Sequence, residues 1–233
     1  MRWWFSQRLI GSSANRGMSG AKCVVLALAV LTAASAVGCA RLETGFGVLT
    51  HLPEGDPAAI RPGHYVTDPE HRFLMLAVTH LGYAQVLARF ARFAAEMDLD
   101  PDHPERFHLV ARIEAASFST GVAGIDDAVR RLLKAQRYPV ITYEARRITR
   151  TGPHTARVDG RLAIAGRSAP VSLDVTFNGA APNPLTGAFT AGFSATGRLK
   201  RSAFALSRWE PAVGDEVAFR IEAEFRLASA AGG

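Results

Sequence analysis

Two histidines in a largely apolar part of the chain, His71 and His80, have the side chains most suited to chemistry. A metal site or a general base built on them would need a third partner and a pocket open to water. Asp68 is near in sequence, but it precedes a proline, where a turn role is more usual. His80 has the same parity as Leu74 and Leu76, so it should point inward at the end of a strand. We therefore predict a hydrogen-bonding role for His80, toward the protein or toward a bound ligand, and no catalytic or metal-binding residue.

Cys39 is the other reactive side chain of interest, because it ends a short apolar run that starts at Cys23. The residues before this run include no acid and four bases, Arg2, Arg8, Arg16 and Lys22. A basic flank, a short apolar run and small residues are typical of a bacterial export signal. A membrane-spanning helix would need about 20 apolar residues. Residues 36–39, AVGC, resemble a lipobox, although Ala36 stands where leucine is preferred.

The processing of this segment has several predicted consequences. Residues 1–38 would be removed, and Cys39 would receive the lipid and anchor a periplasmic lipoprotein in the membrane. Ala40 follows the cysteine in place of the aspartate that resembles an inner-membrane retention signal, so we expect the outer membrane rather than the inner one. An ordinary cleaved signal with a chance cysteine is the alternative, and the true start is either Met1 or Met18.

Removal of the signal changes the charge balance of the protein. The whole chain has 27 basic and 21 acidic residues. Four of the basic residues lie in residues 1–38, so the mature chain would have 23 basic and 21 acidic residues. A nucleic-acid-binding protein should carry an excess of clustered basic charge, so we expect no nucleic acid as a partner. The chain has two cysteines, Cys23 and Cys39, and both lie in or next to the signal, so the mature chain should contain no disulfide.

The elements that would position these residues are mostly strands. Residues 39–62 contain three prolines and several glycines, and they read as a lipid-anchored linker. From residue 63 to residue 229 apolar residues alternate with polar ones, which is the pattern of an antiparallel sheet with one buried face. The expected strands are 72–80, 85–97, 106–118, 139–148, 158–164, 171–177, 189–199 and 216–227. A turn between Gly166 and Pro170 would join two of them into a hairpin.

One segment has helical spacing instead. Residues 125–137 place Ala128, Val129, Leu132 and Leu133 on one face, and Pro139 stops the helix. Its basic residues, from Arg130 to Arg137, would form a solvated face or touch lipid headgroups. One short helix among antiparallel strands favours an all-β barrel with the helix at an end, and a β-sandwich is the competing architecture.

The size of the side chains that face the inside of this barrel determines whether it could hold a ligand. Small residues recur on it at Ala88, Ala111, Ala115, Gly160, Ala191, Ala195, Gly197 and Ala223. They would either leave an apolar channel or interdigitate with large neighbours in a filled core. Composition alone does not separate these two alternatives. A channel with almost no charge would hold an apolar chain rather than a polar metabolite.

Residues 64–97 resemble the opening of the YceI-like family of bacterial extracytoplasmic lipid-binding proteins. The similar positions there are Tyr65, Asp68, Pro69, His71, His80, Leu81, Gly82, Val86, Phe90 and Phe93. Later positions also match, among them Ser117, Thr120, Tyr138, Pro139, Gly160, Pro170, Gly192, Phe193, Arg201, Ser202, Phe204 and Gly214. The chain departs from the family pattern at Arg72, Leu76, Ala88, Ala203 and Ala205.

The resemblance implies a lipocalin-like antiparallel barrel over residues 63–229 that binds a polyisoprenoid or quinone-type lipid, without catalysis and without another cofactor. Members of the family often pair, so a homodimer is also an expectation. The alternation along each strand places every second side chain on the inner face. The expected ligand-binding residues are those on that face: Leu74, Leu76, Val78, His80, Val86, Phe90, Leu109, Ile113, Ile141, Tyr143, Leu162, Leu173, Val175, Phe193, Phe219 and Ile221. Two alternatives stay open. One is a packed scaffold that binds another envelope protein, and the other is an enzyme that uses a metal at His71 and His80.

Overall fold

The structure is a computed structural model that describes residue 48 and residues 51–228. The predicted export signal, Cys39 and the first part of the predicted linker lie outside these residues. Among the described residues, no helix is both long and apolar enough to cross a membrane.

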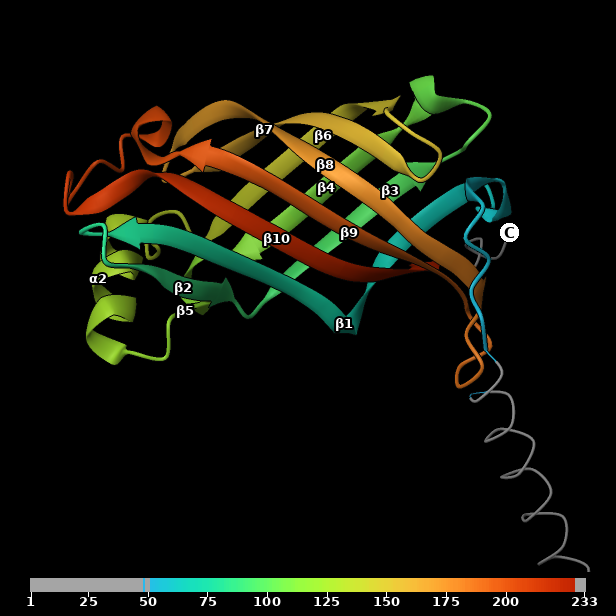
Figure 1. Cartoon of the computed structure of the whole chain (residues 1–233), viewed down its shortest axis with the longest axis horizontal. Coiled ribbons are helices and arrows are strands. Elements are labelled where there is room, and N and C mark those ends of the chain that lie inside the picture. The colour runs from blue at the N-terminus through green and yellow to red at the C-terminus, as the bar shows by residue number, and fades with distance from the viewer. Residues whose placement is uncertain (1–47, 49–50, 229–233) are drawn as a thin grey trace, which may run out of the picture. The chain divides into compact units, whose positions relative to one another are not determined.

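The described chain forms an antiparallel sheet that closes into a barrel (Figure 1). Its hydrogen-bonded order is β10-β9-β8-β7-β6-β4-β3-β1-β2-β5, and β10 pairs again with β1, which closes a ring of eight strands. This closure confirms the predicted barrel and excludes the sandwich. The strands are β1 (Gly63–His80), β2 (Ala84–Phe90), β3 (Phe93–Leu99), β4 (His108–Glu114), β5 (Phe118–Ser119), β6 (Val140–Arg150), β7 (Thr155–Ile164), β8 (Arg167–Pro182), β9 (Phe189–Lys200) and β10 (Val213–Leu227).

Alternating burial along the strands follows the alternation in the sequence. In β8, Val171, Leu173 and Phe177 are buried, whereas Asp174 and Thr176 are exposed. Side chains of one parity therefore fill the barrel, and those of the other parity face outward.

The hairpin between β7 and β8 is tighter than predicted. Its turn consists of Ala165 and Gly166, both with positive φ (51° and 80°), and β8 already begins at Arg167. Two central residues with positive φ match the twist of the flanking strands. Gly166 also leaves room for a ring, because a Cβ there would lie 2.8 Å from Tyr138.

Two of the predicted strands are interrupted. The segment expected at 85–97 divides into β2 and β3, and the segment expected at 106–118 divides into β4, the 3-10 turn η3 (Ala115–Ser117) and β5. Buried Ser117 joins the two breaks. Its hydroxyl accepts a hydrogen bond from the Arg92 amide (3.1 Å) and donates to the Glu114 carbonyl (2.7 Å). The barrel can bend here because the Ser117 hydroxyl takes the place of backbone hydrogen bonds between the strands.

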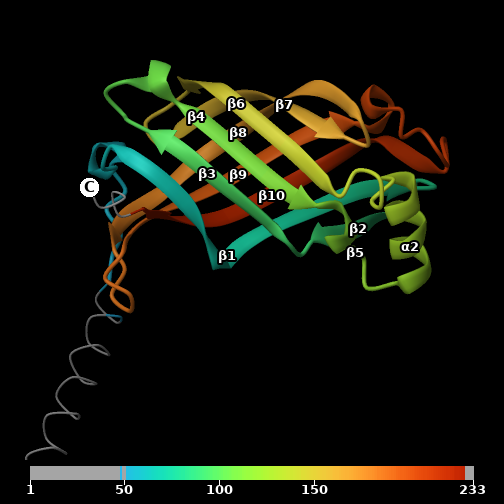
Figure 2. The ribbon, with the colours of Figure 1, turned by 180° about the vertical axis from the view of Figure 1, so that it is seen from behind.

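The helix α2 (Ala123–Leu132) lies at one end of the barrel, as predicted, but its limits differ from 125–137 (Figure 2). It begins earlier because buried Asp126 holds the preceding turn, accepting hydrogen bonds from the amide (2.6 Å) and hydroxyl (2.7 Å) of Thr120. It ends earlier because Lys134 adopts a left-handed φ of 52°, which an α-helix cannot continue.

The described part of the predicted linker packs on the barrel. Glu54 forms a two-way backbone pair with Ala180 (3.0 and 2.9 Å), and the 3-10 turn η1 (Pro57–Ala59) is capped by Asp56. Ile60 is buried in the core. The first strand then starts at Gly63 rather than at residue 72. It passes through an irregularity between Thr67 and Arg72, so its alternation is broken there.

Candidate functional site: the barrel cavity

A cavity of about 1100 Å³ lies inside the barrel. Its walls are almost entirely apolar and come from all the long strands and from α2. About eight strands give an interior that is either just filled or wide enough for one ligand. The cavity shows that this barrel is of the second kind, which resolves the two alternatives that composition left open.

The structure places all sixteen residues expected from inward parity on the cavity wall. Most of them are buried or half-buried, and His80 lies exposed at the rim. The cavity thus brings together the residues of one parity from β1, β2, β4 and β6–β10. Their contact with a ligand stays a prediction.

The cavity wall also includes residues that were not predicted. Ile125, Val129 and Leu132 of α2 line it, and their helical spacing was a usable signal. Phe177 and Phe225 continue the inward parity of β8 and β10 and line it too. Pro57 and Ile60 belong to the segment expected as a linker, and no periodicity in the sequence pointed to them.

Six of the eight small inward residues fall into two groups, and the other two, Ala115 and Ala191, are fully buried and do not line the cavity. Ala88, Ala111, Ala195 and Ala223 line the cavity. Gly160 and Gly197 instead lie beneath aromatic rings, because an added Cβ would come within about 2.5 Å of Tyr143 and Phe219, respectively. The alanines line the empty space, whereas these glycines leave room for the two rings.

Tyr143 is the main polar group deep in the wall. It is buried, and its hydroxyl lies within hydrogen-bonding distance of the carbonyls of Val158 (3.2 Å) and Val171 (3.1 Å). Burial raises the pKa of Tyr143 above its ordinary value near 10, and the charge of Asp159 raises it further. The phenol therefore stays neutral and is satisfied by the protein, which keeps the cavity apolar.

Replacing Tyr143 by phenylalanine should lower the free energy of unfolding by about 1 kcal/mol, because one buried hydrogen-bond donor is lost while the ring remains. Chemical denaturation measures this change. Tyr83→Phe is the matched control, since Tyr83 is exposed, and it should unfold as the wild type does. Equal stability of both variants would show that the phenol of Tyr143 is not held as described.

The two histidines are not brought together. His71 lies outside the cavity, where its ring nitrogen is 3.3 Å from Asp68 and 3.8 Å from Glu224. Burial alone raises the pKa of Asp68, but the Glu70 amide and the charges of Arg226 and His71 outweigh it and hold the pKa below its ordinary value. Asp68 therefore links β1 and β10 as a carboxylate on the outer surface. His80 stands nine residues further along β1, about 30 Å away in an extended strand. In the described ranges, no group of three His, Cys, Asp or Glu side chains is arranged to hold a metal ion.

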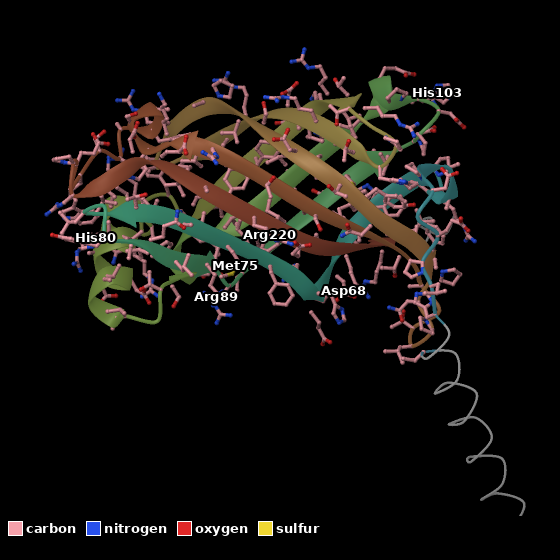
Figure 3. The ribbon with its side chains drawn as sticks, viewed as in Figure 1. Asp68, Met75, His80, Arg89, His103 and Arg220 are labelled. Atoms are coloured by element: carbon pink, nitrogen blue, oxygen red, sulfur yellow. The ribbon has the colours of Figure 1, made fainter. Side chains whose placement is uncertain are left out.

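Figure 3 shows the two ends of the barrel. His80 lies at the end where α2 is found, and His103 lies at the opposite end. The cavity reaches both ends, since exposed residues from each line it, such as Trp209 beside α2 and His154 at the far side.

Arg201 holds the loop at the α2 end. The 3-10 turn η4 (Arg201–Phe204) follows β9, and the Arg201 guanidinium is buried. It donates hydrogen bonds to four carbonyls, those of Leu206 (2.6 Å), Arg208 (3.1 Å), Val213 (2.7 Å) and Gly214 (2.8 Å). One side chain thus fastens both ends of the loop that carries Trp209.

Comparisons with known proteins agree with this architecture. The family profile described as YceI-like domain matches residues 65–225. A UPF0312 protein of Vibrio cholerae is 28% identical over 154 residues, which are 64% of this chain and 81% of that protein. The crystal structure of BcnA of Burkholderia cenocepacia has a TM-score of 0.59 at 26% identity, with 68% of this chain and 98% of that chain covered.

A second solved structure shows the fold alone. It is a polyisoprenoid binding domain from Saccharophagus degradans, with a TM-score of 0.53, 12% identity, and coverage of 72% of this chain and 100% of that one. The matched part of this chain covers 98% of BcnA and 100% of this domain, and the residues of this chain from His51 on form one compact unit.

Proposed function

Because this chain belongs to the family of YceI-like domains and its barrel is hollow, we propose that it binds an apolar isoprenoid- or quinone-like lipid inside the barrel. The observation that carries the proposal is the cavity of about 1100 Å³ with its nearly uncharged wall. That volume lies just above the usual range for ligand sites, about 300–1000 Å³. The fold that the chain shares with a polyisoprenoid binding domain supports the same class of ligand.

The composition of the wall determines which ligand is favoured. Burial of each methylene contributes about 0.8 kcal/mol, and a chain of several isoprene units would therefore bind tightly even after the costs of ordering it are subtracted. A polar metabolite would lose its bonds to water and find few partners, since the Tyr143 hydroxyl is already engaged. The proposed role is therefore binding, sequestration or carriage, and no catalytic step is assigned.

The experiment that tests this role is organic extraction of natively expressed protein followed by mass spectrometry. We expect a polyprenol or a prenylated quinone at near one molecule per barrel, and uptake of added polyprenol by delipidated protein. Recovery of no lipid together with no uptake would overturn the proposal. The alternative of a filled scaffold is not proposed, because the interior holds a cavity.

We further propose that the protein works in the bacterial envelope, anchored through a lipid on Cys39 and facing the periplasm from the outer membrane. The support is the basic flank, the apolar run and the AVGC segment of the sequence. Pairing of two barrels also stays a prediction, which analytical ultracentrifugation would test.

Replacement of Cys39 by serine should move the protein from the membrane fraction to the soluble periplasmic fraction, because the acyl anchor can no longer be attached. Cell fractionation with immunoblotting measures this, and Cys23→Ser serves as the matched control that should stay in the membrane. An unchanged membrane fraction for the Cys39→Ser variant would contradict lipid anchoring at this residue.

A further inference from the structure

We propose that the end of the barrel formed by α2, the β1–β2 turn and the loop after η4 docks on an anionic phospholipid surface, so that lipid enters the cavity there. The inference rests on the proposed function, because it assigns a route to the same cavity. Residues 81–83, 121–138 and 201–212 make up this face, which we call the α2 face. A backbone bond from the Leu81 amide to the Ala212 carbonyl (2.7 Å) joins the turn to the loop.

Apolar side chains project from the α2 face into solvent. Those with large exposed fractions are Leu81 (55%), Tyr83 (89%), Val122 (54%), Ile125 (39%) and Trp209 (38%). They come from three separate segments of the chain, and the views in Figures 1 and 2 place these segments at one end of the barrel. Tyrosine and tryptophan are the side chains that favour the boundary between water and lipid. Scattered apolar residues need no explanation, but five around one opening form a surface suited to an interface.

The opening itself lies among these residues. Ile125, Trp209 and His80 each line the cavity and are also exposed to solvent. Trp209 has a left-handed φ of 73°, which costs energy for a bulky residue. The Arg201 bonds to the Arg208 and Val213 carbonyls hold this conformation, so the indole is kept at the edge of the opening.

The two ends of the barrel differ in charge, and this difference favours an anionic surface as the partner of the α2 face. The basic side chains at or next to the α2 face that have no ion pair within the described part of the chain are Arg131, Lys134, Arg137, Arg167 and Arg208. The three acids on this face are already engaged: Asp126 accepts two hydrogen bonds from Thr120, Asp127 pairs with Arg130 (3.2 Å), and Glu210 lies 3.7 Å from Arg201.

The loops at the opposite end are acidic instead, with Glu54, Asp56, Asp100, Asp102 and Glu105 against Arg61, Arg106 and Arg150. An anionic membrane attracts basic residues that lie within a Debye length of it and repels acidic ones. The α2 face therefore combines the two features that hold a protein at such a surface, exposed apolar tips and unpaired basic charge. The acidic end lacks the second feature.

Vesicles without polyprenol test docking separately from lipid uptake. The protein used is residues 51–233, in which Trp209 is the sole tryptophan. We expect binding to vesicles of phosphatidylglycerol and phosphatidylcholine in equal parts, a blue shift of Trp209 emission, and quenching by brominated acyl chains. Each basic residue near an anionic surface strengthens binding about fivefold, so Arg131→Gln combined with Arg137→Gln should weaken it about 30-fold.

The matched control is Arg61→Gln combined with Arg106→Gln, which removes two positive charges at the opposite end of the barrel. This control should bind nearly as the wild type does. Equal weakening by both pairs, or binding without quenching of Trp209, would overturn the proposal. Binding to polyglutamate but not to vesicles would also overturn it and would indicate an acidic protein partner. If polyprenol uptake fails while the vesicle results hold, the proposed lipid cargo is wrong and the docking surface is supported. If polyprenol is taken up but the vesicle results fail, the cargo is supported and the docking surface is wrong.

Discussion

Replacing Ala195 by tryptophan should reduce polyprenol uptake at least tenfold while the barrel stays folded. Ala195 lies on β9 between Val175 of β8 and Ile221 of β10, and all three line the cavity. An indole at this position would project into the space that the lipid chain needs. In a filled core such a substitution costs about 1–3 kcal/mol of stability. Here the ring enters an existing space, so we expect a loss of stability below about 1 kcal/mol.

The control is Ala94→Trp. Ala94 is exposed and lies next to Arg112 of β4, on the outer face of β3, so it adds the same ring outside the cavity. Its uptake should equal that of the wild type. Uptake is measured with delipidated protein and radiolabelled polyprenol, and folding is measured by thermal unfolding. Full uptake by a folded Ala195→Trp variant would show that the lipid does not occupy the cavity, and it would remove the central argument for the function.

Alternation along the strands was enough to predict the part of the cavity wall that the strands build. Side chains alternate strictly along a strand, so Val171, Leu173 and Val175 share one face whatever the neighbouring strands are. Closure of the sheet turns that shared face into an interior. The empty space itself could not be predicted, because it depends on where rings such as those of Tyr143 and Phe219 lie, and each ring rests on a glycine of a neighbouring strand.

Two of the differences from prediction occur where a side chain replaces a backbone bond. Ser117 allows two strands to break, and Asp126 allows α2 to begin early. Neither interaction has a periodic signature, since each depends on contacts with residues in another segment or in an adjoining turn. The packing of Ile60 was also hidden, because one buried residue in a proline-rich segment gives no pattern. Family resemblance marked Ser117 and Arg201 as positions of interest, and the structure shows the hydrogen bonds that each one makes.

Replacing Arg201 by methionine should lower the free energy of unfolding by about 3 kcal/mol, because a buried guanidinium with four carbonyl acceptors is removed. Methionine keeps much of the apolar stem but donates no hydrogen bond, so the carbonyls of Leu206 and Val213 lose their charged partner. Arg201→Lys should recover only part of the loss, since a single ammonium cannot reach all four acceptors in the geometry of a guanidinium.

Urea denaturation measures this effect, and Arg198→Met gives the comparison. Arg198 is exposed and pairs with Glu216 at 2.8 Å, and surface ion pairs of this kind contribute about 0–1 kcal/mol. Because Arg201 fastens the loop that carries Trp209, its loss should also shift Trp209 emission toward that of tryptophan in water before the barrel unfolds. Equal destabilisation by the two variants, with unchanged Trp209 emission, would mean that the loop is held by something other than Arg201.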